Sequence, residues 1–294
     1  MKIYPLEKEA GLESQIIDIK NANASLNILS SQGNAEYAAT AAFNPKPMDS
    51  SNKEWIAKGL SRDVMWIRAN LVSTTWNKND DVFTIEDTWK ARYTAMYKPL
   101  NMGHLGRESA GANTTFGVIT NTYACDDDMK YIWDIPKEGF NIGIEGLIWA
   151  RYFPSQAAEI KENIDNGIQS ISMECNMGDF GYALKPQDEP DTILLMPRHE
   201  ITAWMTKSLR IFGGTGEIEI NAKKYKVGRW LRDIIFTGGG FTLQPADPNA
   251  KVPEYIMPDA KASIKQKVIK LSDFSQASVL NIANKGKYTL WPIQ

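Results

Sequence analysis

The sequence predicts an α+β fold built on a mostly antiparallel, barrel-like sheet. Two observations support this fold class. Short segments with the apolar patterns of strands recur along the chain, separated by turn residues, and only a few segments have helical periodicity. In addition, a chain of 294 residues, 43% hydrophobic and 23% charged, is long enough to bury one sizeable core. We therefore expect one main domain with appendages.

The expected domain boundaries follow changes in composition. Residues 1–58 are rich in Asn, Ala and Ser and have weak periodicity, which is typical of a loosely ordered arm. Residues 59–258, in which apolar strand and helix patterns recur, form the expected main domain. Residues 259–294 are rich in Lys, Ser and Ala, which favours a detachable or poorly packed tail.

The first part of the main domain predicts a strand, a turn and a helix. Residues 64–72 are mostly apolar on both strand faces, so the strand is expected to be buried on both sides. The polar run at 77–81 ends this strand as a turn. Thr84 and Asp87 then have the spacing of a capping box, which predicts a helix over 84–93.

The middle of the domain predicts two strands and a second helix. A loop rich in Gly, Ser and Asn at 106–115 leads into apolar strands at 116–124 and 142–150. The next helix is expected over 156–166, because a proline precedes it and Gly167 follows its last residue.

The last part predicts a short strand at 168–175, a helical segment at 201–209, and two strands at 217–220 and 230–243. The glycine-rich segments Gly213–Gly216 and Gly238–Gly240 are not followed by the residues of a phosphate-binding loop. Tight turns or a bulged strand explain them better.

Composition excludes several classes of function. A formal net charge of −2 argues against a general nucleic-acid binder, since neutralising phosphates requires a basic surplus. No apolar run approaches the roughly 18 residues of a membrane span, and the first residues lack the apolar region of a secretory signal. We expect an intracellular protein without a membrane partner.

Histidine and cysteine are scarce, with two of each in the chain. His199 and Glu200 do not complete the HExxH zinc motif, and two cysteines are too few for a cysteine-rich zinc site. The sequence therefore predicts no metal and no cofactor. Any mechanism that uses an imidazole must use His104 or His199.

Ser172 and His104 are the two candidates for catalytic chemistry on their sequence pattern alone. Ser170, Ser172 and Glu174 share one face of the 168–175 strand, and a solvated strand face is the alternative explanation. Cys175 lies on the opposite, apolar face, where a packing role is expected. His104 lies in a loop-like context, where an imidazole is suited to general base catalysis near neutral pH. A surface histidine without a function is the alternative.

Four stretches, in their order along the chain, resemble the prohead proteases of tailed bacteriophages, which are distant relatives of the herpesvirus maturation protease. These stretches are Asn77–Thr84, Lys98–His104, Ile171–Cys175, and Gly228–Gly238 running into Pro245–Pro248. The resemblance covers about residues 60 to 258.

The resemblance implies a serine endopeptidase with Ser172 as nucleophile and His104 as general base. A serine hydroxyl needs an adjacent base, so the two side chains must lie within hydrogen-bond reach. The third member stays open among His199, Glu174 and Asp179, because relatives use either an acidic residue or a second histidine. His199 follows the apolar strand at 193–196, whose pairing beside the Ser172 strand would present the ring to His104.

The oxyanion hole is expected from backbone N–H groups or an arginine. The arginines considered are Arg198, Arg210 and Arg229. The resemblance also implies a small antiparallel barrel surrounded by helices, and cleavage after a motif with an aliphatic residue two positions before a glutamate. Ile160–Glu162 has this form, although a helical site would resist self-cleavage.

The implied partners are the phage scaffold protein, the major capsid protein, the portal and further copies of the chain itself. The implied location is the host cytoplasm, inside the assembling prohead. The competing hypothesis is a catalytically inactive structural or scaffold protein of the phage head with the same fold. Such a protein would not need both His104 and Ser172.

Overall fold

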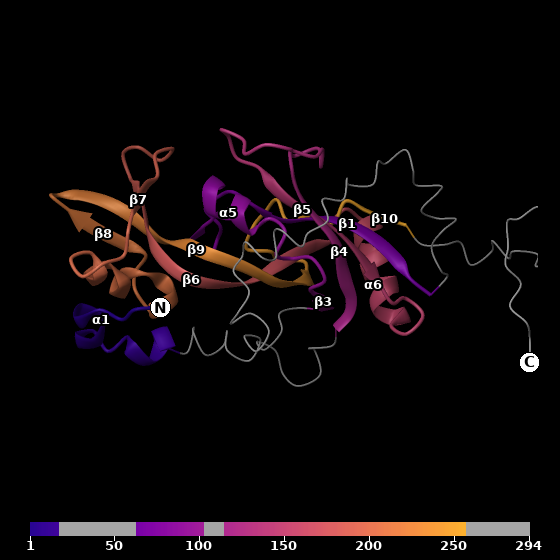
Figure 1. Ribbon diagram of the computed structural model, residues 1–294, viewed down its shortest axis with the longest axis horizontal. Helices are drawn as coiled ribbons and strands as arrows, with labels where there is room; N and C mark the ends of the chain where they lie inside the picture. Colours follow the sequence, from indigo (N-terminus) through magenta and orange to yellow (C-terminus); the bar gives the residue numbers. More distant parts are fainter. Residues whose placement is uncertain (18–62, 103–114, 257–294) are drawn as a thin grey trace, which may run out of the picture. The chain divides into compact units, whose positions relative to one another are not determined.

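The computed structural model describes residues 1–17, 63–102 and 115–256 (Figure 1). These residues form a mostly β fold in which one mixed, mostly antiparallel sheet of ten strands curls into a half-barrel. The mostly antiparallel sheet predicted from the sequence is confirmed. The described helices are few and short, so the fold of the described residues is mostly β.

The strands are β1 (Met65–Ser73), β2 (Asp81–Val82), β3 (Pro99–Met102), β4 (Thr115–Cys125), β5 (Asn141–Ile148), β6 (Ser170–Pro186), β7 (Leu194–Met196), β8 (Glu217–Ile220), β9 (Lys223–Thr242) and β10 (Glu254–Ile256). Their order in the sheet is β10-β1-β5-β4-β3-β9-β6-β7, and β2 and β8 also pair with β9. β9 pairs in parallel with β2 and β3 and antiparallel with β6 and β8. It therefore joins the two ends of the sheet.

The described helices are α1 (Pro5–Glu9), α5 (Ile85–Ala91), α6 (Pro154–Asp165) and the 3₁₀ helices η2 (Ala203–Ser208) and η3 (Arg210–Phe212). α5 begins as predicted, because the Thr84 hydroxyl accepts a hydrogen bond from the Asp87 backbone N–H. α6 ends before Gly167, whose φ of 69° favours glycine. None of the described helices is both long enough and apolar enough to cross a membrane.

Strand β6 is longer than the sequence pattern predicts. The expected strand at 168–175 continues to Pro186, and β9 pairs with it from Ser170 to Pro186. The polar run around Gly178 interrupts the apolar pattern without ending the strand. A Cβ atom at Gly178 would lie 2.8 Å from the Asp233 Cβ, so a glycine lets the two strands stay together here.

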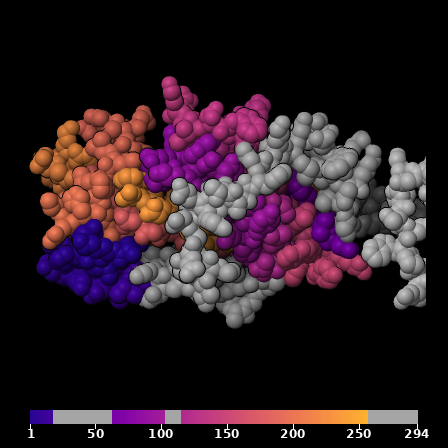
Figure 2. All heavy atoms as spheres, viewed as in Figure 1, coloured from indigo at the N-terminus to yellow at the C-terminus, as the bar shows by residue number. Residues whose placement is uncertain are grey.

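The main core lies inside the curled sheet, where β1 and β5 contribute mostly alternate residues such as Ile67 and Ile144, while intervening positions carry buried polar residues such as Arg68. A second apolar cluster lies around the far half of β6 and includes Leu12 and Ile16 from the amino-terminal segment. Figure 2 shows this segment, in indigo, lying against the orange residues. The first 17 residues of the expected arm therefore pack on the sheet. Residues 18–58 and the expected tail at 259–294 lie outside the described residues.

Candidate active site

Ser172 lies on β6 opposite Gly240 of β9. Its neighbour Ile171 is fully buried in the main core and Met173 packs against this core, so Ser172 projects from the opposite face, as the alternation predicts. Ser170 shares this face but is fully buried, and its hydroxyl accepts a hydrogen bond of 3.4 Å from Lys251 Nζ. Ser172 is partly exposed, which makes it the more accessible of the two hydroxyls.

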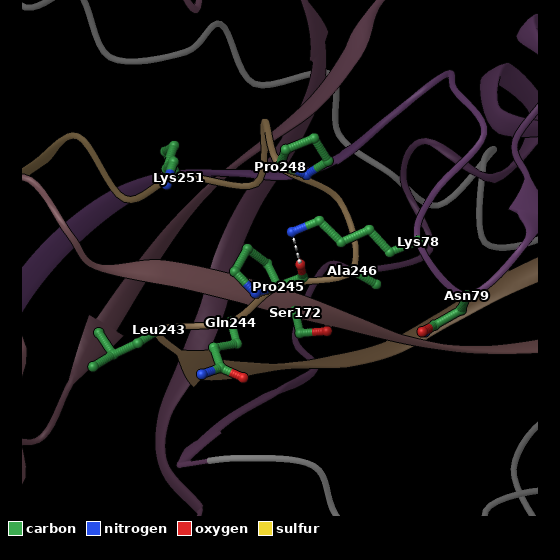
Figure 3. Close-up of a pocket in the computed structure, with 9 residues that line it drawn as sticks. All are labelled: Lys78, Asn79, Ser172, Leu243, Gln244, Pro245, Ala246, Pro248 and Lys251. Carbon is green, nitrogen blue, oxygen red and sulfur yellow. Dashed lines mark hydrogen bonds between the residues drawn. The ribbon is translucent and has the colours of Figure 1, made fainter.

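Ser172 opens into a cavity of about 560 Å³ (Figure 3). The cavity is lined by Lys78, Asn79, Ser172, Leu243, Gln244, Pro245, Ala246, Pro248 and Lys251. Its two lysine ammonium groups come from opposite parts of the chain, one from the turn before β2 and the other from the segment before β10. A substrate group entering this cavity would meet positive charge.

Short hydrogen bonds hold the loops that frame the cavity. The Asn77 side-chain oxygen accepts hydrogen bonds from the backbone N–H groups of Asn79 and Asp81. The Lys78 N–H donates to the Ala246 carbonyl at 3.0 Å, which joins the two loops directly. The cavity walls are therefore fixed independently of any ligand.

Two rows of residues cross the sheet at this site. The Ser172 row consists of Asn101 on β3, Gly240 on β9 and Ser172 on β6, because Gly240 pairs with both of its neighbours. The Glu174 row consists of Pro99, Gly238 and Glu174, and a Cβ atom at Gly238 would lie 2.9 Å from Glu174 Oε2 and 3.0 Å from the Pro99 oxygen. Both glycines leave the centre of this face without a side chain.

The glycine-rich segment of β9 agrees with its interpretation as a bulged strand. The register of β6 and β9 shifts between the pairs made by Glu174 and Cys175, next to Gly238. The other glycine-rich segment makes tight turns, in which Gly213 and Gly216 have φ values of 82° and 78°.

His104 lies outside the described residues. The described part of β3 ends at Met102, two positions earlier in the chain, and Met102 pairs with Phe241 beside the Ser172 row. Glu174, one of the three candidates for the third member, lies on the face of Ser172, as expected from the alternation.

The other two candidates for the third member are not near Ser172. Asp179 lies seven residues further along β6 than Ser172, a path of about 23 Å along the strand at about 3.3 Å per residue, and makes ion pairs with Arg198 and Arg232. β7, the strand before His199, does pair with β6, but at Tyr182–Leu184, a path of about 33 Å or more along the strand from Ser172 by the same rise. The structure therefore does not bring Asp179 or His199 to Ser172.

The three arginines considered as oxyanion donors all make ion pairs. Arg198 pairs with Glu7, Arg210 with Asp80, and Arg229 with Asp81. On β9, Arg229 lies opposite Tyr182 of β6. Each of these guanidinium groups therefore already has a carboxylate partner.

Both thiols are poor candidates for nucleophiles. Cys175 packs against the main core, and burial raises the pKa of its thiol to about 12. Burial likewise raises the pKa of the Cys125 thiol to about 12. Since the thiolate is the reactive form, neither side chain is activated near neutral pH.

The sequence reasoning did not single out Lys78 and Lys251. Lys78 lies in the Asn77–Thr84 stretch that resembles the prohead proteases, but only the packing of its turn against residues 245–248 brings it to Ser172.

Within the described parts of the chain, no three side chains of the metal-binding types gather in one place. The chain matches no family model, no curated protein and no solved structure.

Proposed function

We propose that the protein is a serine endopeptidase of the phage prohead and herpesvirus maturation type, with Ser172 as nucleophile and His104 as general base. Its substrates are the scaffold and capsid proteins of an assembling phage head. The observation that carries the proposal is the Ser172 row, in which Ser172 lies across a single glycine from Asn101, three positions before His104.

The chain geometry supports a short distance between the two catalytic groups. Neighbouring strands are about 4.8 Å apart, so the Cα atoms of Asn101 and Ser172 are about 10 Å apart. Two residues of extended chain span at most about 7 Å, which limits how far His104 can be from Met102. The required hydrogen bond of about 2.6 to 3.2 Å between imidazole and hydroxyl is within this reach.

We assign the third catalytic role to Glu174. Its Oε2 atom lies over Gly238 toward Pro99, on the strand that leads to His104. A carboxylate in this place would hold the imidazole in the tautomer that accepts the serine proton.

The cavity beside Ser172 fits the glutamate that the resemblance implies before the cleaved bond. Lys78 and Lys251 line this cavity, where their ammonium groups donate to the Pro245 carbonyl and the Ser170 hydroxyl, and their positive charge attracts a carboxylate. By contrast, the internal sequence Ile160–Glu162 lies within α6, and Ile160 is fully buried. Cleavage of the folded chain there would first require α6 to unfold.

Co-expression with the phage scaffold protein, followed by gel analysis, tests the proposal. We expect Ser172→Ala and His104→Ala proteins to remain folded and to leave the scaffold uncut. Ser170→Ala is the matched control, because this hydroxyl is on the same strand face but buried, and it should retain cleavage. Cleavage that persists in the Ser172→Ala protein contradicts the assignment and leaves only the structural hypothesis.

A second comparison tests the third role. Glu174→Gln should slow scaffold cleavage by about 10²- to 10⁴-fold, as expected when a base loses its orienting partner. Asp179→Asn and His199→Gln serve as controls and should cleave at the rate of the unaltered protein. A slow His199→Gln protein with a normal Glu174→Gln protein would reverse the assignment.

A further inference from the structure

Asn101 is a fully buried side chain whose amide donor has no partner among the described residues. Its Oδ1 atom accepts a hydrogen bond of 2.9 Å from the Thr115 hydroxyl. Its Nδ2 atom has no hydrogen-bond partner among the residues that the structure describes. Thr115 thus fixes the orientation of the carboxamide and leaves the donor end available.

An unused buried donor is unfavourable for stability. Burying an N–H group without a partner costs stability relative to a satisfied group, because the donor loses its hydrogen bonds to water. Native proteins keep few such groups, and each one requires an explanation. Donors kept ready for charge that develops during a reaction are one such explanation.

The position of Asn101 indicates which reaction this donor serves. Asn101 and Ser172 occupy the two ends of the Ser172 row and project from the same face of the sheet. Gly240 lies between them and contributes no side chain. With Cα atoms about 10 Å apart, a carboxamide and a hydroxyl that lean toward each other leave room for about one oxygen atom between them.

We propose that Asn101 Nδ2 donates a hydrogen bond to the oxyanion formed during attack by Ser172. This inference rests on the proposed function. Ser172 Oγ bonds to the substrate carbonyl carbon and its proton passes to the base, while the carbonyl π electrons move onto oxygen. That oxygen, now negative, accepts from Asn101. When the tetrahedral intermediate collapses, the electrons return, the C–N bond breaks, and the leaving amine takes the proton from the base.

The burial of Asn101 is consistent with this role. A donor shielded from water stabilises developing charge more strongly than one in solvent, and it needs no reorganisation during the reaction. By contrast, the guanidinium groups of Arg198, Arg210 and Arg229 are already paired with carboxylates.

Reaction of the full-length protein with a fluorophosphonate tests the inference, because the phosphonyl oxygen occupies the position of the oxyanion. Saturation kinetics separate the maximal labelling rate, kinact, from the binding constant, KI. Asn101→Leu should lower kinact by about 10²- to 10³-fold with KI unchanged. Its thermal stability should be equal to or higher than that of the unaltered protein, since leucine has a similar shape and no unpaired donor.

Two further variants separate catalysis from packing. Asn121→Leu replaces another buried asparagine with an unsatisfied atom, on β4 and outside the Ser172 row, and should label at the normal rate. Thr115→Val keeps the Asn101 donor but removes its anchor, so it should lower kinact by a smaller factor.

Normal labelling of a folded Asn101→Leu protein overturns the inference and leaves the proposed function intact. A fall in labelling that only follows a fall in stability, in Asn101→Leu or Thr115→Val, also overturns it. Failure of the unaltered protein to become labelled at Ser172 overturns the proposed function, and the inference with it.

Discussion

At the residue scale, Ser170 and Ser172 present the same hydroxyl group from one strand in two different environments. Lys251 covers Ser170 and bonds to it, whereas Ser172 opens into the cavity. Side-chain alternation predicted their shared face correctly. It could not predict which hydroxyl is accessible, because that depends on how a loop about 80 residues away in sequence packs against β6.

Gly238 provides the first prediction at this scale. An alanine there would place its Cβ atom 3.0 Å from the Pro99 oxygen, which is backbone and cannot easily move, and 2.9 Å from Glu174 Oε2. We expect Gly238→Ala to lower the free energy of unfolding by about 1–3 kcal/mol, measured by urea denaturation. Gly238 is not among the glycines with a positive φ, so the loss reports the crowding at its Cβ position. An unchanged Gly238→Ala protein would contradict the close packing of the Glu174 row.

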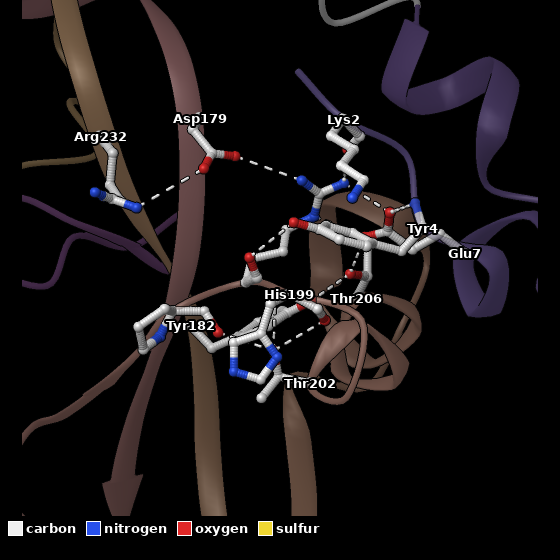
Figure 4. Close-up of polar contacts among 11 residues, drawn as sticks. Lys2, Tyr4, Glu7, Asp179, Tyr182, His199, Thr202, Thr206 and Arg232 are labelled. Carbon is white, nitrogen blue, oxygen red and sulfur yellow. Dashed lines mark hydrogen bonds and ion pairs between the residues drawn. The ribbon is translucent and has the colours of Figure 1, made fainter.

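At the element scale, the amino-terminal segment is held by one buried ion pair. Both side chains, Glu7 and Arg198, are almost completely buried, and their atoms approach to 2.6 Å. The Thr206 hydroxyl and the Tyr4 backbone N–H also donate to the Glu7 carboxylate (Figure 4). The sequence did not predict this contact, because a glutamate near the start of the chain normally indicates an exposed position and its partner lies near β7.

Breaking this pair should be strongly destabilising. Arg198→Met leaves the Glu7 carboxylate buried without its cation, and we expect a loss of about 3–5 kcal/mol in the free energy of unfolding. The Glu7→Gln/Arg198→Met double variant removes both charges and should lose less than the single variant. Urea unfolding measures both. A double variant less stable than Arg198→Met would contradict this account of the segment.

Predictions for whole elements succeeded where the signal was local. The strands at 116–124 and 142–150 and the capped helix after Thr84 were predicted to within a few residues, because apolar patterns and caps are properties of neighbouring residues. The length of β6 was not predicted, because pairing with β9 keeps the polar middle of β6 in a strand. The predicted helical segment at 201–209 contains the 3₁₀ helix η2, and a second one, η3, follows it at 210–212.

At the scale of the whole molecule, the sequence predicted a mostly antiparallel sheet but not its strand order. β3 and β6 flank β9 although long stretches of chain separate all three, and such pairing has no local signature. The site depends on this order. The sequence pattern placed Ser172 and Glu174 on one strand face, whereas the positions of Asn101 and the two cavity lysines beside Ser172 follow only from the strand pairing and loop packing.

Buried acidic groups should make the whole molecule sensitive to alkaline pH. Burial raises the pKa of the Cys125 thiol from 9.0 to about 12, and it also raises the pKa values of the Tyr123 and Tyr182 phenols. The folded state therefore holds these protons more tightly than the unfolded state does. This contribution to stability is complete below pH about 9 and decreases as pH rises toward about 12.

Urea unfolding at a series of pH values tests this expectation. The free energy of unfolding should decrease above pH about 9, and less steeply in Cys125→Ala than in the unaltered protein. Parallel pH profiles of the two proteins would show that this thiol is not protected in the way the structure indicates.

The most direct test of the central claim is the pH dependence of fluorophosphonate labelling at Ser172, with the modified peptide identified by mass spectrometry. If His104 is the base, labelling of the unaltered protein accelerates as pH rises through the range near 6.5 in which an imidazole loses its proton. His104→Ala should label slowly and without this step, and Ser172→Ala should not label there at all. A His104→Ala profile that matches the unaltered protein would contradict the claim that His104 activates Ser172.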